Sequence, residues 1–134
     1  MDIKELSIGN WVRYDFPEIG KRNIQVNSID EEDNHIGAGG VGASVWSDVS
    51  EFEPIPLTPE ILEKNGLEYE DDENDAVIFL CCDMFWARLC VGDTFWQVGI
   101  HNEDRLDAVV CNVKHTHQLQ NALRLADITI EFVV

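Results

Sequence analysis

Positively charged residues are scarce in this sequence. Nine Lys and Arg stand against 26 Asp and Glu, which leaves a formal net charge of −17 at pH 7. A protein that binds nucleic acid directly must neutralise phosphates with Lys and Arg, and an anionic membrane surface makes the same demand. The composition therefore argues against both ligands, whereas it fits a partner protein with a basic surface.

Long apolar runs and paired cysteines are also missing. No run approaches the roughly 20 residues needed to cross a bilayer, and "MDIKELSIGNW" has no apolar region of a signal peptide. We therefore expect a soluble, cytoplasmic protein. No C-x-x-C pair occurs, so we expect reduced core thiols and no cofactor. The four cysteines are Cys81, Cys82, Cys90 and Cys111.

The length of 134 residues fits one compact domain or two small lobes. Residues 1–57 hold three β-rich runs that end in turn residues, at 5–16, 22–36 and 43–55, and these predict a small SH3-like β lobe. A short helix over 58–65 should follow. Thr58 suits its N-cap, Pro59 its first turn and Gly66 the position just after its end.

Residues 58–134 predict a second, α+β lobe. Apolar runs between about 76 and 113 are typical of an antiparallel β-meander, with a two-residue turn at Gly92-Asp93. The spacing of Leu119, Ala122, Leu123 and Ala126 predicts a helix over about 116–125. The alternation in "DITIEFVV" predicts a closing strand over 127–134. The fold class expected for the whole chain is α+β.

The turn at Gly92-Asp93 sets the register of the hairpin around it. It pairs Trp86 with Gly99, Arg88 with Gln97, and Cys90 with Phe95. One face should be core, made of Phe85, Ala87, Leu89, Val91, Trp96, Val98 and Ile100. On the other face, Trp86 could simply cover the backbone of Gly99. Alternatively, this face could form an aromatic platform for a partner. The platform would consist of Trp86, Arg88, Phe95 and Gln97.

A glycine-rich segment and two acidic segments partly match the sequence motifs of a dinucleotide-binding site and of a calcium-binding loop. "GAGGVG" at 37–42 satisfies G-x-G-x-x-G, but acidic residues precede it and an extended run follows, so it predicts a flexible glycine loop. "DEED" at 30–33 and the acidic stretch 67–76 lack the residue order of a calcium loop. Both acidic segments should be solvated loops.

His115-Thr116-His117 could be a metal site or the start of a helix. With Thr116 as N-cap, His117 is the first helical residue and the two imidazoles should diverge. This pattern favours a structural role over metal binding. Neither the cysteines nor the serines stand in a local signature of a nucleophile, so an enzyme is disfavoured.

Three segments carry a resemblance: "IGNWV", "EPIPLTPEILEKNG" and "H-x-L-Q-N-A-L-R-L". Together they resemble a group of short uncharacterised proteins, often encoded in prophage or mobile elements of gut anaerobic bacteria. The likeness leaves out the loops at 30–45 and 67–83. It implies a bacterial accessory protein, and it implies no functional residues because the group has no assigned activity.

We therefore expect a noncatalytic, acidic accessory protein that acts by binding another protein, one with a basic surface. One alternative is an acidic decoy, whose carboxylates imitate nucleic-acid phosphates toward a DNA-binding protein. Another is a metal-dependent or hydrolase-like enzyme that uses His115 and His117. The terminal strand over 127–134 could also pair with a second copy of the chain and give a homo-oligomer.

Overall fold

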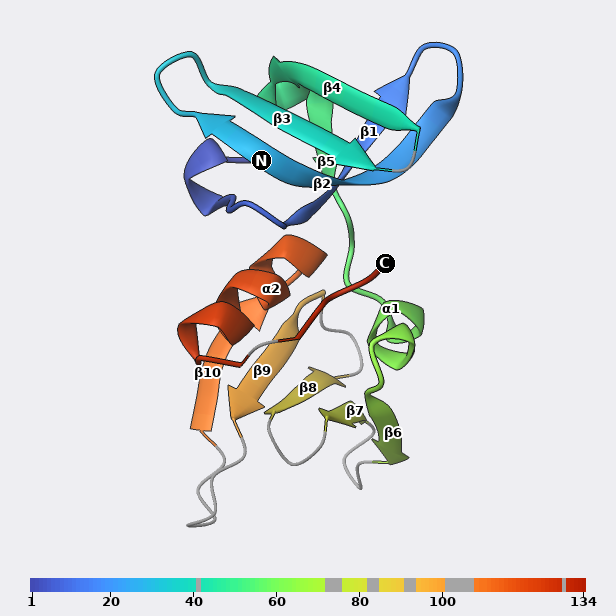
Figure 1. The fold of residues 1–134 in the computed structure, drawn as a ribbon. Helices are drawn as coiled ribbons and strands as arrows, with labels where there is room; N and C mark the ends of the chain where they lie inside the picture. The colour runs from blue at the N-terminus through green and yellow to red at the C-terminus, as the bar shows by residue number, and fades with distance from the viewer. Residues whose placement is uncertain (41, 72–75, 82–84, 91–93, 101–107, 129) are drawn as a thin grey trace. The chain divides into compact units, whose positions relative to one another are not determined.

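The computed structural model describes residues 1–40, 42–71, 76–81, 85–90, 94–100, 108–128 and 130–134 (Figure 1). Two antiparallel sheets and two α-helices make up most of these residues, which confirms the α+β class. The chain divides into an N-terminal unit, residues 1–55 and 115–121, and a C-terminal unit, residues 56–114 and 122–134. The predicted boundary at residue 57 instead places all of 115–121 in the second lobe. None of the described helices is both long and apolar enough to cross a membrane.

The N-terminal unit is built on a five-stranded antiparallel sheet in the order β4-β3-β2-β1-β5. Its strands are β1 (Trp11–Phe16), β2 (Gly20–Asp30), β3 (His35–Gly40), β4 (Ala43–Asp48) and β5 (Phe52–Pro54). Two 3₁₀ turns accompany them, η1 (Ile3–Glu5) and η2 (Val49–Glu51). The three predicted β-rich runs hold β1, β4, β5 and most of β2, whereas most of β3 lies between the second and third runs.

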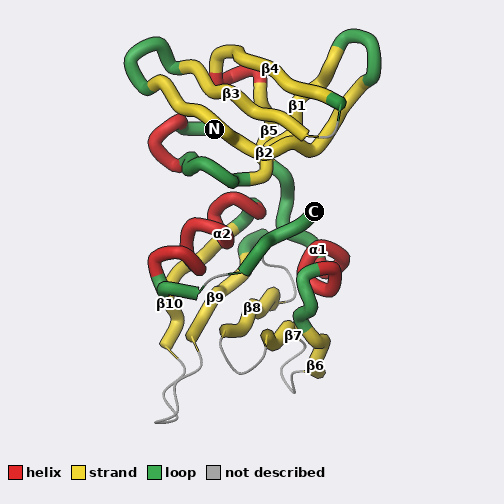
Figure 2. The backbone as a smooth tube through the Cα atoms, in the orientation of Figure 1, coloured by secondary structure: helices red, strands yellow, loops and turns green. Residues whose placement is uncertain are grey.

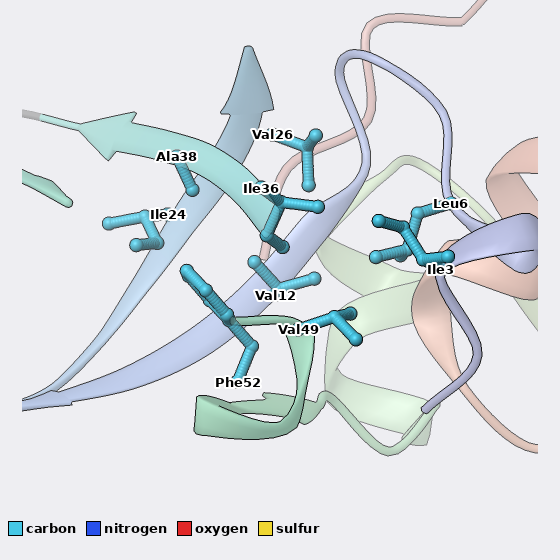
Figure 3. Close-up of a cluster of buried hydrophobic side chains, with 9 residues drawn as sticks. All are labelled: Ile3, Leu6, Val12, Ile24, Val26, Ile36, Ala38, Val49 and Phe52. Atoms are coloured by element: carbon cyan, nitrogen blue, oxygen red, sulfur yellow. The ribbon is translucent and has the colours of Figure 1, made fainter. Parts of the chain in front are cut away.

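One side of this sheet carries the hydrophobic core of the unit (Figure 3). Alternate residues of each strand reach it, so that Val12, Ile24 and Ile36 are at most 1% exposed. The other members of the cluster are Ile3, Leu6, Val26, Ala38, Val49 and Phe52. Burying an aliphatic side chain of this size contributes about 1.5–3 kcal/mol, so the cluster is the main support of the sheet.

The glycine-rich segment forms part of the sheet, so the predicted flexible loop is wrong for its first residues. Residues 35–40 form β3, which pairs with β2 on one side and β4 on the other. A glycine can occupy a strand where neighbouring side chains crowd the place of a Cβ atom, and the nearest such neighbour of Gly37 is the Ser28 hydroxyl. Gly42, with φ +76°, supplies the left-handed residue of the turn into β4.

The C-terminal unit contains a second five-stranded antiparallel sheet, in the order β10-β9-β8-β7-β6. Its strands are β6 (Glu68–Asp71), β7 (Ala76–Cys81), β8 (Phe85–Cys90), β9 (Trp96–Ile100) and β10 (Ala108–Val113). Strands that neighbour in sequence also neighbour in the sheet, which confirms the predicted meander. The acidic stretch 67–76 is not all loop, because its residues 68–71 pair with β7 as strand β6.

The helix α1 (Pro59–Lys64) follows the predicted capping pattern. The Ile61 N–H donates to Oγ1 of Thr58 at 3.3 Å, which satisfies one of the free donors of the first turn. Gly66 has φ +84° and donates to the Glu63 carbonyl, while Leu67 donates to the Leu62 carbonyl. These two bonds form a Schellman motif, which ends the helix at the predicted place.

The helix α2 (Thr116–Leu125) has the predicted bounds, but the predicted closing strand is wrong. The described residues after it, 127–128 and 130–134, form no strand and appear as loop in Figure 2. Asn65 instead uses its side chain to accept from the Val133 N–H at 2.8 Å and to donate to the Val133 carbonyl at 2.7 Å. An amide side chain thus takes the place of a neighbouring strand, and the expected pairing of a terminal strand with a second copy loses its basis.

Candidate functional site

The sheet of the N-terminal unit has a second face, opposite its core, which we call the outer face. Side chains alternate along each strand, so the neighbours of the core residues Val12, Ile24 and Ile36 point to this face. Polar residues dominate it. The outer face includes Arg13, Asn23, Gln25, Asn27, Asp30, His35, Ser44, Trp46 and Asp48.

Trp46 is the exposed aromatic residue of this face. It lies opposite Gly37 in the β3–β4 register, and a Cβ atom added to Gly37 would stand 3.1 Å from Cε3 of the indole. The ring therefore leans over the glycine backbone, yet Trp46 remains 54% exposed. The His35 imidazole stands beside it, with 5.8 Å between the ring centroids and 32° between the planes. The indole of Trp46 thus lies between Gly37 and the His35 imidazole, and about half of its surface is exposed to solvent.

Carboxylates lie at the end of the outer face where Asp30, His35 and Asp48 pair across neighbouring strands. Asp48 is two residues further along β4 than Trp46, and hydrogen bonds from the Ser50 backbone, the Ser50 side chain and Asn34 lower its pKa despite some desolvation. Its carboxylate is therefore ionised at neutral pH. The last residue of β2 and the turn after it add four more acids, and the turn leads into His35, whose Nδ1 is 2.6 Å from the Asp33 carbonyl oxygen. We call these carboxylates the acidic rim: Asp30, Glu31, Glu32, Asp33 and Asp48.

The hairpin that was predicted to carry an aromatic platform has the predicted register. Trp86 pairs with Gly99 and Arg88 with Gln97, while the third predicted pair depends on a turn at 91–93 that lies outside the described residues. Trp86 is 9% exposed, and a Cβ atom on Gly99 would overlap its indole. The structure thus favours the covering interpretation of Trp86 over an exposed platform.

The remaining residues of that hairpin agree with this interpretation. Arg88, Phe95 and Gln97 are half-buried. On the opposite face, the described side chains that were expected in the core are mostly buried: Phe85, Ala87, Trp96 and Val98. Leu89 is only partly buried, and Val91 lies outside the described residues.

His115 and His117 stand at the start of α2, one residue away from their predicted positions. The His115 carbonyl accepts from the Leu119 N–H, and the His115 N–H donates to Oε1 of Gln118 at 3.0 Å. His115 is therefore the N-cap in a capping box, and Thr116 is the first helical residue. The prediction that the two imidazoles diverge is wrong: they stack with 5.8 Å between centroids and 7° between planes. The angle of 200° between alternate residues holds only inside a helix, and His115 lies outside α2 both in the prediction and in the structure, so helix geometry was no reason to expect divergence.

His117 is 1% exposed, and neither of its ring nitrogens has a hydrogen-bond partner among the described residues. Its nearest charged neighbour is Glu5, with 3.7 Å between Nε2 and Oε2. Burial lowers the pKa of His117, and the neighbouring His115 lowers it further, so the imidazole is neutral at pH 7. The structure does not bring His, Cys, Asp and Glu together in a group of three or more that could hold a metal, as far as its described residues go.

The cysteines offer no activated nucleophile among the described side chains. Cys111 is half-buried, and desolvation raises its pKa, so its thiol is less ionised than a free cysteine at neutral pH. The side chains of Cys81, Cys82 and Cys90 lie outside the described residues. Among the described residues, Trp46 with the acidic rim is one arrangement that can bind a ligand.

Trp46 was missed in the sequence, although a signal for it was present. In "ASVWSDV" it shares its parity with Ser44 and Asp48 and not with Val45, so strict alternation places it on the solvent side. Comparisons with protein-family models, curated proteins and solved structures found no match to this chain. The inference about function therefore rests on the chemistry of the outer face.

Proposed function

We propose that the protein is a noncatalytic binding protein, which holds a basic segment of a partner protein against the outer face of its N-terminal unit. The observation that carries this proposal is the exposure of Trp46, 54%, beside the acidic rim. A large exposed aromatic side chain is a common anchor of binding energy at interfaces. The carboxylates next to it select a positively charged group over a neutral or anionic one.

The energetics of such a contact favour Lys or Arg. A cation over the face of an indole gains about 0.5–1 kcal/mol at an exposed site and about 2 kcal/mol or more when the site loses water. The carboxylate of Asp48 lies on the same strand face and can pair with the same cation or its neighbour. The net charge of −17 would speed the encounter with a basic partner, most strongly at low salt.

We also assign the N-terminal unit to the SH3-like class of small β-barrels. The order β4-β3-β2-β1-β5, with the 3₁₀ turn η2 between β4 and β5, supports this assignment. The class hosts many functions, so the assignment supplies a scaffold for the binding surface and does not identify the partner.

Replacing Trp46 by Ala should weaken the binding of a basic peptide about tenfold or more, because the cation loses its aromatic partner. The measurement is isothermal titration calorimetry with a ten-residue peptide of alternating Arg and Thr, at 50 and 300 mM NaCl. The matched control is Tyr69→Ala, which removes an aromatic side chain of similar exposure, 52%, from the C-terminal unit. This control should bind like the wild type.

Equal affinities of the wild type and Trp46→Ala would contradict the proposal. If binding also disappeared at 300 mM NaCl, the result would favour the acidic decoy, whose contacts are electrostatic alone. Metal analysis of the purified protein tests the remaining alternative. A stoichiometric metal ion that is lost in His115→Ala would favour a function based on the histidines.

A further inference from the structure

The strand β4 forms one edge of the N-terminal sheet (Figure 1). All six of its residues pair with β3 in a continuous register, without a bulge. A neighbouring strand forms hydrogen bonds with the N–H and C=O groups of every second residue. The N–H and C=O groups of the other residues of β4 therefore point away from β3. An unprotected edge of this kind is a template for a further strand.

The opposite edge of the same sheet is protected by the shortness of its strand and by a proline, and β4 has neither. β5 is only three residues long, and Pro54 removes one of its N–H groups. It also carries Glu53, whose carboxylate forms an ion pair with Lys21 at 3.1 Å. β4 contains no Pro and no Lys, and its residues Ser44 and Trp46 are exposed. Among the described residues, the sheet thus protects one edge and leaves the other, β4, without a further strand beside Trp46.

We infer that the basic segment binds as an additional β-strand along β4, an inference that rests on the proposed function. Main-chain hydrogen bonds to the open edge would supply affinity without regard to sequence. Alternate side chains of the added strand would then lie on the outer face, next to Ser44, Trp46 and Asp48. A recognised segment therefore carries cationic residues at every second position.

Charge decides between a basic partner and a second copy of this chain. Pairing of two β4 strands would bring together two chains that each carry a net charge of −17. Repulsion between two such chains opposes their association. An added strand with Arg gains instead, because the planar guanidinium stacks on the indole and pairs with a carboxylate through two hydrogen bonds. Arg should therefore be preferred to Lys.

Two backbone-methylated forms of the alternating Arg–Thr peptide test the inference. In a strand that pairs along one edge, only every second amide donates to the neighbour. We therefore expect N-methylation of all Arg residues and N-methylation of all Thr residues to differ at least tenfold in their effect on affinity. One form should bind like the parent peptide, and the other should lose binding.

The controls separate this inference from the proposed function. The proposed function fails if the parent peptide does not bind, or if it binds the Trp46→Ala variant and the wild type with equal affinity. The inference then fails with it. If both methylated forms bind like the parent, or both lose affinity equally, strand addition is overturned while the Trp46 site stands. Replacing Arg by Lys throughout the peptide should reduce affinity without changing the difference between the two methylated forms.

Discussion

Replacing Gly99 by Ala should lower the free energy of unfolding by about 2–3 kcal/mol, the usual cost of forcing an extra group into a packed site. A Cβ atom at this position would overlap the indole of Trp86. The ring has little room to move, because Trp86 is only 9% exposed. Either the indole leaves its rotamer or the β8–β9 pairing shifts, and both are costly. Urea unfolding followed by circular dichroism measures the change.

Gly37→Ala is the matched control. Gly37 also lies opposite a tryptophan, Trp46, in the sheet of the N-terminal unit. Its added Cβ atom would meet the ends of three side chains, the Ser28 hydroxyl, the Asn27 amide oxygen and the indole of Trp46. These side chains can move aside on the outer face, where Trp46 is 54% exposed, so we expect a cost below about 1 kcal/mol.

A double-mutant cycle decides whether the Trp86 ring causes the effect at Gly99. In the Trp86→Ala background the obstructing ring is absent, so Gly99→Ala should lose most of its cost. If the cost is the same in both backgrounds, the explanation by overlap is wrong. A backbone requirement of Gly99 itself would then have to account for it.

In the β8–β9 hairpin, the strand register could be predicted from the sequence, but the buried face could not. A two-residue turn and strict alternation determine which residues face each other, so the Trp86–Gly99 and Arg88–Gln97 pairs were predictable. Which face is buried depends on packing by segments far away in the chain, about which alternation says nothing. The same reason applies to Trp46. Alternation indicates which side of the sheet Trp46 occupies, but it does not indicate whether that side is exposed to solvent.

Two other errors had local causes. The alternation in residues 127–134 is typical of a strand, but the Asn65 side chain binds the backbone of Val133 and occupies the donor and acceptor that a strand would use. At α2 the capping residue was misplaced by a single position. Gln118 accepts from the N–H of His115, which is the N-cap, and the two imidazoles stack where divergence was expected.

Below pH 6.5, His117 should destabilise the protein progressively. The pKa of His117 is lowered from 6.5 in the folded state, mainly by burial and then by the neighbouring His115, while the charge of Glu5 raises it. In the unfolded chain the imidazole therefore takes up a proton at a higher pH than in the folded protein. The stability that depends on neutral His117 is complete above pH 6.5 and is lost as the pH falls below that value.

The surrounding contacts explain why His117 cannot escape into water. Asn121 donates to the Glu5 carbonyl at 2.7 Å, and Asn10 donates to Oδ1 of Asn121 at 2.9 Å. Gln120 accepts from the Trp11 N–H at 2.9 Å. These bonds hold the N-terminal segment against the first turns of α2, so a proton on His117 must be accommodated in place or the segment must separate.

Substitution of His117 by Leu isolates its contribution. Lowering the pH also neutralises some of the 26 acidic residues, which relieves repulsion and acts in the opposite direction. The quantity to compare is therefore the difference in unfolding free energy between variant and wild type, measured in urea at pH 8, 7, 6 and 5.5. At pH 8 we expect His117→Leu to have an unfolding free energy equal to or higher than that of the wild type. The substitution removes two buried ring nitrogens that have no hydrogen-bond partner among the described residues, and each such nitrogen costs about 1–3 kcal/mol. The excess of the variant's unfolding free energy over that of the wild type should grow below pH 6.5.

His35→Gln, at a half-buried histidine on the outer face, provides the matched control for the loss of an imidazole. A difference between His117→Leu and the wild type that stays constant from pH 8 to 5.5 would mean that His117 is protonated as readily in the folded chain as in the unfolded one.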